Sequence, residues 1–297
     1  MNFIHLKYAV EIEKTGSISK AAENLFMGQP NLSKAIKELE NETGITIFIR
    51  TPKGVRPTEQ GQAFLKKARE LISGFENFSE SYSKDASKGI CFRISVPKAD
   101  YISNAFTSFV SMLDSTMDVS LKYEEADNED IIKRIMDFDI GMGIIRLSAD
   151  NEKQYLKLFE KNNIKYSILW EFDQRILCSR ESLLAKQSKV INGNDLDEFT
   201  ELVFDEGLSG RRVIKVHDRG SRNDLLTTIA DTYMWVSPTP KSVLEQYRLI
   251  QLNVNTEKRR YKDILIFRND YNMSRLDEQF ISELERVKEK IRIDKLN

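Results

Sequence analysis

The sequence predicts a small α+β head at its N-terminus, then one long helix, then a large doubly wound α/β domain. Three observations favour this order. Two short helical segments meet at a tight turn near the N-terminus, a heptad repeat follows, and strands then alternate with helices. The chain has 297 residues and a formal net charge of -1, and this length allows two or three domains of ordinary size.

The head begins with three helices, of which the second and third form a helix-turn-helix. Gly16 ends the first helix, Ser17 can cap a short helix over residues 18–25, and Gly28 permits the turn before a third helix. In this motif the second of the two helices enters the major groove. Its polar face offers side chains for base edges and phosphates, namely Gln29, Asn31, Ser33, Lys34 and Lys37.

A hairpin wing is expected after the third helix. Residues 45–50 predict a strand, Thr51-Pro52-Lys53-Gly54 a turn, and Val55-Arg56 the returning strand. Three basic side chains lie near the tip: Arg50, Lys53 and Arg56. On spacing alone, a three-helix bundle whose polar face is merely solvated is the alternative to a DNA-binding head.

The long helix carries an apolar seam. Thr58 can cap it, and no proline follows before Pro97. Large apolar residues recur at heptad spacing: Phe64, Ala68, Leu71, Phe75, Phe78 and Tyr82. Unpaired, these side chains would be exposed to water, so we expect two chains to pair here. Docking of the seam onto its own domain is the alternative. Residues 83–89 predict a linker.

These N-terminal residues resemble LysR-type transcriptional regulators. Residues 16–25, GSISKAAENL, look like the second helix of the family, and residues 29–40, QPNLSKAIKELE, resemble its recognition helix. Residues 44–48, then Arg50 and Thr58-Glu59-Gln60-Gly61, follow the family's wing and the start of its linker helix. Gly28, Lys34 and Pro57 depart from the common pattern, which has Ser or Thr, Arg and Leu at these places.

The resemblance implies residue roles and partners. It assigns DNA binding to Ser17, Gln29, Pro30, Asn31, Ser33, Lys34, Lys37, Arg50, Thr51 and Lys53. The heptad seam itself assigns dimerisation to Phe64, Ala68, Leu71, Phe75 and Phe78. The implied partners are double-stranded DNA with an interrupted inverted repeat, a second copy of the chain in a dimer that assembles into a tetramer, a small-molecule effector, and RNA polymerase.

The C-terminal part alternates strands, at residues 90–96, 119–123 and 139–145, with helical segments, which indicates an α/β domain. The resemblance implies a two-lobed effector-binding domain like a periplasmic binding protein. The expected domains are 1–58 (winged helix-turn-helix), 59–89 (linker helix) and 90–297 (effector domain). Lobe I then covers about 90–162 and 266–297, lobe II about 163–265, with crossovers near 162–165 and 261–267.

Candidate effector-binding residues follow from sheet geometry, because ligands bind beyond the carboxyl ends of strands. They are Lys98, Ser103, Asp127, Asp205 and Ser221. For each of them, a helix cap or a solvated polar residue is the alternative. Lys98 and the helix N-termini suit an anionic ligand.

Catalytic and metal sites have little support. The chain has two cysteines, Cys91 and Cys178, and two histidines, and no phosphate loop or nucleophile elbow. We therefore expect no catalytic residue, cofactor or metal. No stretch reads as a signal peptide or membrane span, so a cytoplasmic location is expected.

Two function classes stay open at this point. The first is a ligand-responsive transcriptional regulator without catalysis. The second is an enzyme or small-molecule-binding protein whose helical N-terminus only oligomerises. The heptad seam and the polar face of the third helix favour the first, because the second leaves both unexplained. Residues 1–89 also carry 13 basic and 11 acidic side chains, a slightly basic head on a slightly acidic remainder.

Overall fold

The structure, a computed structural model, describes residues 2–52, 54–82, 90–116, 119–187, 190–204, 212–255 and 259–293. The chain divides into two compact units. Unit 1 is Met1–Ile90 with Asp137–Asp139, and unit 2 is Cys91–Met136 with Ile140–Asn297. Within the described ranges, no helix has the length and apolar character needed to span a bilayer.

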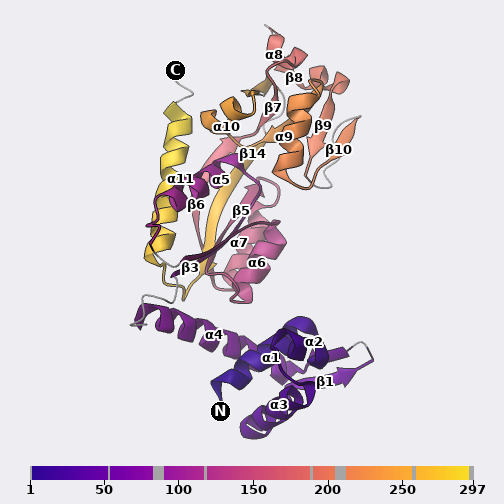
Figure 1. Cartoon of the computed structure of the whole chain (residues 1–297). Helices are drawn as coiled ribbons and strands as arrows, with labels where there is room; N and C mark the ends of the chain where they lie inside the picture. Colours follow the sequence, from indigo (N-terminus) through magenta and orange to yellow (C-terminus); the bar gives the residue numbers. More distant parts are fainter. Residues whose placement is uncertain are drawn as a thin grey trace. The chain divides into compact units, whose positions relative to one another are not determined.

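Unit 1 is a winged helix-turn-helix followed by a long helix, as predicted (Figure 1). Its elements are α1 (Phe3–Thr15), α2 (Ile18–Asn24), α3 (Gln29–Thr43), β1 (Phe48–Thr51), β2 (Gly54–Pro57) and α4 (Glu59–Tyr82). Ser17 caps α2 by accepting the Lys20 backbone N–H. Gly16 and Gly44 end α1 and α3 in the left-handed conformation, with φ of 63° and 70°.

The wing begins later than the sequence predicts. The strand expected from residue 45 starts at Phe48. The Glu40 carboxylate on α3 accepts the backbone N–H groups of Ile47 and Phe48 at 2.6 and 3.0 Å. These two N–H groups therefore bond to a helix side chain, and the segment before Phe48 connects α3 to the wing.

One core holds unit 1 together. Ala21 and Ala22 are buried where α2 meets its neighbours. Helix α4 contributes Leu65 and Ala68 to the same core. Gly61 lies so close to the segment before the wing that a Cβ there would be 2.1 Å from the Ile47 carbonyl oxygen. The start of α4 is thus packed directly against the head.

The first lobe of unit 2 is built on a sheet of order β4-β3-β5-β14-β6. Its strands are β3 (Ile90–Val96), β4 (Val119–Glu125), β5 (Met142–Ser148), β6 (Ile164–Asp173) and β14 (Arg260–Arg268). Helices α5 (Asp100–Ser111) and α11 (Arg275–Ile293) pack on one face (Figure 1). Helices α6 (Asn128–Met136) and α7 (Glu152–Lys161) pack on the other.

The second lobe has a sheet of order β10-β9-β11-β7-β12. Its strands are β7 (Arg175–Ser179), β9 (Thr200–Val203), β10 (Val213–Lys215), β11 (Thr232–Val236) and β12 (Leu249–Leu252). Helices α9 (Arg219–Thr228) and α10 (Lys241–Gln246) lie on one face, and α8 (Leu183–Lys186) and the 3-10 helix Gly193–Glu198 on the other. Strands β8 (Ile191–Asn192) and β13 (Val254–Asn255) form a separate parallel pair.

The two lobes are joined differently from the prediction. Strands β6 and β14 pair antiparallel along their whole length in the first sheet. The chain therefore crosses between the sheets near Gln174 and Arg259, where the Gln174 N–H donates to the Arg259 carbonyl at 2.9 Å. The chain does not cross at the predicted 162–165 and 261–267, because β6 begins at Ile164 in the sheet of lobe I and β14 runs through 261–267 in the same sheet.

Candidate functional site

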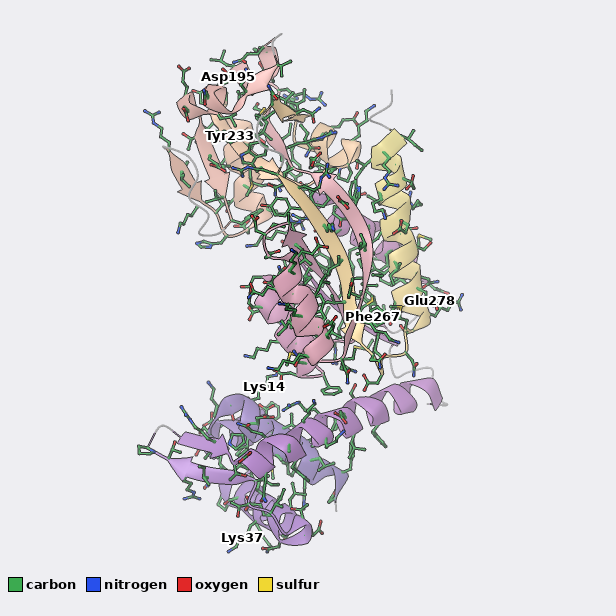
Figure 2. All side chains as sticks on the ribbon, turned by 180° about the vertical axis from the view of Figure 1, so that it is seen from behind. Lys14, Lys37, Asp195, Tyr233, Phe267 and Glu278 are labelled. Carbon is green, nitrogen blue, oxygen red and sulfur yellow. The ribbon has the colours of Figure 1, made fainter. Side chains whose placement is uncertain are left out.

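The polar face of α3 is open to solvent. Gln29, Pro30, Asn31, Lys34 and Lys37 are exposed, and Ser33 is half-buried. Figure 2 shows Lys37 projecting from α3 into solvent. The opposite face of α3 buries Leu32, Ala35, Ile36 and Leu39 in the core. The helix therefore presents hydrogen-bonding and cationic side chains along one side while the apolar side fixes its orientation.

The start of α3 has no side-chain cap. Gly28 occupies the cap position, and its carbonyl accepts the N–H groups of Asn31 and Leu32 at 3.0 and 3.2 Å. Phe26 precedes it in the turn with φ of 53° and is 97% exposed. A bulky residue seldom adopts this left-handed conformation, so the turn carries local strain.

The wing is fixed to the helices by backbone contacts. The Val55 N–H donates to the Gly16 carbonyl at 2.8 Å. Gly54 has φ of 117°, and a Cβ there would lie 2.6 Å from the Gly16 oxygen. Arg50 is exposed on β1, whereas the half-buried Thr51 donates its hydroxyl to the Gly54 carbonyl at 2.9 Å. Lys53 lies outside the described residues.

The predicted seam of α4 divides into two parts. Ala68 is 2% exposed and belongs to the core of its own domain, and Phe64 is partly buried against that core. Leu71 and Phe75 are 55% and 52% exposed. The Phe78 side chain lies outside the described residues. The docking alternative thus applies to Ala68 and Phe64, and in part to Phe75, whose ring centre lies 4.5 Å from that of Phe3. Pairing through Leu71 and the exposed part of Phe75 stays a prediction.

Unit 2 contains a cavity of about 570 Å³ between its lobes. The first lobe and the crossing strands contribute Lys98, Asp100, Arg146, Gln174, Arg259 and Tyr261. The second lobe contributes Glu201, Phe204, Arg222, Met234, Trp235 and Ser237, together with adjacent residues of the same strands. A volume of this size fits a small organic molecule.

Cationic side chains dominate the lining of this cavity. The Lys98 ammonium lies 4.8 Å from the Phe204 ring centre, and the Arg259 guanidinium 4.3 Å from the Trp235 ring centre. Within the described ranges, neither Lys98 nor Arg259 forms an ion pair with a carboxylate. Each cation lies against an aromatic face and has no carboxylate within ion-pair distance among the described residues, which leaves N–H groups available to an anion.

The third cation of the lining is neutralised internally. Arg146 donates two hydrogen bonds of 2.7 Å to the fully buried Asp263 carboxylate. The Tyr101 hydroxyl donates to the same carboxylate at 2.7 Å. Burial, together with the charge of Asp263, raises the pKa of Tyr101 well above its usual range. The charge of Arg146 is therefore matched by Asp263 within the protein.

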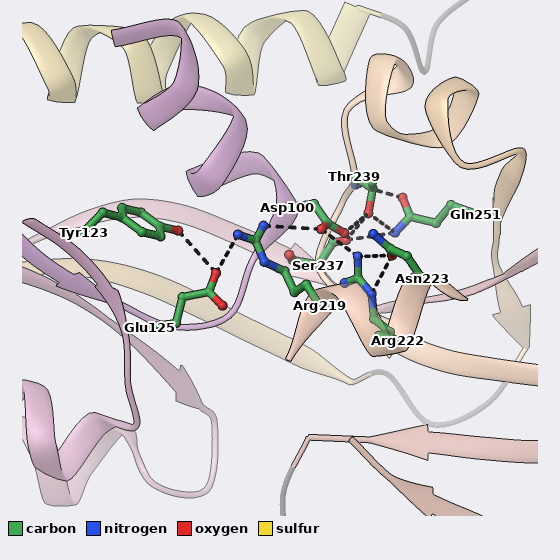
Figure 3. A network of polar contacts seen from close by, with 9 residues as sticks. All are labelled: Asp100, Tyr123, Glu125, Arg219, Arg222, Asn223, Ser237, Thr239 and Gln251. Carbon is green, nitrogen blue, oxygen red and sulfur yellow. Dashed lines mark hydrogen bonds and ion pairs between the residues drawn. The ribbon is translucent and has the colours of Figure 1, made fainter. Parts of the chain in front are cut away.

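A polar network links the two lobes beside the cavity (Figure 3). Asp100 of α5 accepts from Arg222 of α9 at 2.8 Å, and Arg219 pairs with Glu125 at 3.0 Å. The Tyr123 hydroxyl donates to Glu125 at 3.4 Å. Burial raises the pKa of Glu125 above its usual value of 4.5, although Arg219 acts in the opposite direction.

The predicted effector-binding residues lie in different places in the structure. Lys98 lines the cavity. Asp127 accepts the Asp130 N–H at 2.9 Å and lies at a second hollow of about 550 Å³. Ser221 donates its N–H and hydroxyl to Asp218 at 2.8 and 2.7 Å, so it belongs to the cap of α9. Ser103 lies on α5 and is not among the described residues that line the cavity. Asp205 falls outside the described residues.

Sequence reasoning missed the residues that connect the two lobes, Asp100, Arg219 and Arg222, and also the cavity residue Arg259. A partial signal was available, because Arg219 and Arg222 are spaced three apart in the first turn of a helix that Asp218 caps. Their partners on lobe I carry no local signature. Burial raises the pKa of the Cys178 thiol to about 12, so this cysteine is unsuited to nucleophilic chemistry.

Residues 3–62 match the family described as "Bacterial regulatory helix-turn-helix protein, lysR family". The chain is 37% identical over 91 residues to the HTH-type transcriptional regulator YcgK of Bacillus subtilis, covering 31% of this chain and 28% of that protein. It is 29% identical over 147 residues to the HTH-type transcriptional regulator TfdT of Cupriavidus pinatubonensis, covering 48% and 64%. The matches thus span less than two thirds of these relatives.

The whole chain also has the fold of a solved family structure. Full-length LysG of Corynebacterium glutamicum, with bound effector Arg, superposes with a TM-score of 0.57 over 97% of this chain and 98% of that one, at 16% identity. The likeness shows that the head, the long helix and the two α/β sheets occur together in one known architecture. Residues 3–62 thus form a helix-turn-helix head of the LysR family, and the whole chain shares the fold of a full-length regulator of that type.

Proposed function

We propose that this protein binds double-stranded DNA at promoters and regulates transcription in response to a small-molecule effector. The exposed polar face of α3, on a head that matches the family's helix-turn-helix, carries this proposal. Gln29, Asn31 and Ser33 read base edges, and Lys34, Lys37 and Arg50 contact phosphates. Ser17, Pro30, Thr51 and Lys53 are proposed to bind the DNA as well.

A dimer would place two such heads on one duplex. The exposed Leu71 and Phe75 on α4 support pairing along that helix. A symmetric pair of heads reads an interrupted inverted repeat, because the symmetry of the site mirrors that of the protein. Dimers joining through the effector domains into a tetramer, with RNA polymerase as a further partner, complete the proposal.

The effector is proposed to be a small anion in the cavity between the lobes. Lys98 and Arg259 supply positive charge without carboxylate partners among the described residues, and Phe204 and Trp235 supply flat apolar surfaces. Bound ligand acts by favouring one arrangement of the lobes or subunits over another. A panel of carboxylates and phosphorylated metabolites should raise the melting temperature of wild type more than that of Lys98→Ala with Arg259→Ala. Absence of any ligand shift would refute the anionic assignment.

A footprint on the DNA upstream of the protein's own gene tests the DNA-binding proposal. Wild type should protect an interrupted inverted repeat, and Ser33→Ala with Lys34→Ala should lose the protection while its oligomer size is unchanged. Lys165→Ala, which removes one exposed charge from unit 2, is the matched control and should protect normally. Protection by the double variant equal to wild type would show that α3 is not the reading surface.

A further inference from the structure

One buried carboxylate in the cleft is bound as a ligand would be. Asp100 is the first residue of α5 and is 5% exposed. Its carboxylate accepts from Arg222 Nη2 at 2.8 Å and from the Thr239 hydroxyl at 3.4 Å, and the Arg219 guanidinium lies at 3.7 Å (Figure 3). Two guanidinium groups and a hydroxyl converging on one carboxylate are the usual elements of a carboxylate-binding site.

The groups that bind Asp100 all come from the other lobe. Arg219 and Arg222 lie in the first turn of α9, and Thr239 follows β11. Asp100 belongs to lobe I, so the contact spans the cleft and joins the lobes. Asp100 and Arg222 line the same cavity as Lys98 and Arg259, to which we assign the effector, but the contact uses neither of these two cations.

The groups that bind Asp100 are held in place by contacts within lobe II. Arg222 Nε and Nη2 donate to the Asn223 side-chain oxygen at 3.0 and 2.7 Å, and Arg222 is 1% exposed. Gln251 accepts the Thr239 N–H at 3.1 Å and donates to the Ser237 carbonyl at 2.8 Å. These bonds do not involve Asp100. The site can therefore keep its shape when the Asp100 side chain is absent.

Arg219 has a second carboxylate partner, Glu125, whereas Arg222 has only Asp100 among the described residues. Glu125, on the lobe I strand β4, accepts from Arg219 at 3.0 Å. Arg222 has no other carboxylate within ion-pair distance among the described residues. Because a buried guanidinium without a counter-charge is strongly destabilising, Arg222 depends on Asp100.

We propose that Arg222, Arg219 and Thr239 form a carboxylate-binding subsite, and that Asp100 fills it as a tethered ligand which holds the lobes closed without effector. This proposal deepens the proposed function, since it concerns the regulation of the effector cleft. An effector then enters a cleft that is already closed on one side, so its binding free energy is not spent on bringing the lobes together.

Chemical rescue of the full-length protein tests the subsite. Asp100→Ala is expected to melt lower than wild type, by on the order of 10 °C. Potassium acetate should recover at least half of this loss in a saturable manner, compared with potassium chloride at the same ionic strength. Wild type, whose subsite is full, and the double variant Asp100→Ala with Arg222→Met, whose subsite is dismantled, should show a clearly smaller acetate-specific shift, limited to what acetate binding at Lys98 and Arg259 gives to all three proteins alike.

Two results would overturn the proposal. One is an acetate effect of equal size in all three proteins, and the other is a folded Asp100→Ala that does not respond to acetate. If Asp100→Ala is recovered unfolded, the readout is the yield of folded protein after dilution from urea into acetate or chloride, and an equal yield refutes the subsite. Neither measurement uses DNA or effector, so failure here leaves the proposed function intact, and a failed footprint leaves the subsite intact.

Discussion

Substituting Leu71 by Glu tests whether two chains pair along α4. Leu71 is 55% exposed in the single chain. Fully burying a leucine is worth about 1.5–3 kcal/mol, so covering its exposed part gives about 0.8–1.6 kcal/mol per chain. A symmetric dimer contains the contact twice, so the substitution should cost roughly 2–3 kcal/mol before any charge effect. This corresponds to a rise of about 30- to 150-fold in the dimer Kd.

Sedimentation equilibrium over a wide range of protein concentration measures this Kd. Gln62→Glu is the matched control, because Gln62 is exposed on α4 and nine residues before Leu71, which places it on the opposite side of the helix. The control should dimerise like wild type. A Leu71→Glu dimer as tight as wild type, or a monomeric wild type, would refute pairing along this helix.

Three further predictions concern single residues. Phe26→Asn should raise the free energy of unfolding by about 1 kcal/mol, because Asn tolerates the left-handed backbone of this exposed position better; an unchanged urea midpoint would contradict this. Gly61→Ala should destabilise unit 1 by about 1–3 kcal/mol, because its Cβ would meet the Ile47 oxygen at 2.1 Å; wild-type stability by circular dichroism would show that the backbone adapts freely. Burial raises the pKa of Glu125 above its usual 4.5, so the folded chain binds the proton of this carboxyl group more tightly than the unfolded chain does. The stability of wild type therefore falls as the pH rises from 4.5 through the raised pKa. The melting temperature of Glu125→Gln minus that of wild type should therefore increase from acid to neutral pH, and a constant difference would argue against the burial effect.

The head could be predicted because its signals are local. Gly16 and Ser17 act on backbone groups within a few residues of themselves, and the face of α3 follows from helical spacing alone. The start of the wing was harder to predict from the sequence. It depends on Glu40, which bonds to N–H groups seven and eight residues further along the chain, and no periodicity reports such a bond.

The cleft was predicted only in part because its contacts are distant in sequence. Lys98 was found from the rule that ligands bind beyond strand ends, and it lines the cavity. Asp100 and Arg222 are 122 residues apart, and only the tertiary fold brings them together. Ser221 fits the same rule but serves a helix cap, since a strand end does not say which polar group faces the cleft. The crossovers were misplaced because long strands look alike on either side of a lobe boundary.

The close approach of Gly61 to Ile47 has a mechanical consequence. The Thr58 hydroxyl donates to the Thr46 carbonyl at 2.6 Å and accepts the Gly61 N–H at 2.8 Å, so the first turn of α4 is bonded to the segment that carries the wing. A helix of 24 residues is about 36 Å long. With no hinge at this junction, α4 acts as a rigid lever. A rotation applied at its far end turns the wing and α3 through the same angle. In the dimer that we propose, a small change in the tilt of α4 would become a large change in the distance between the two heads.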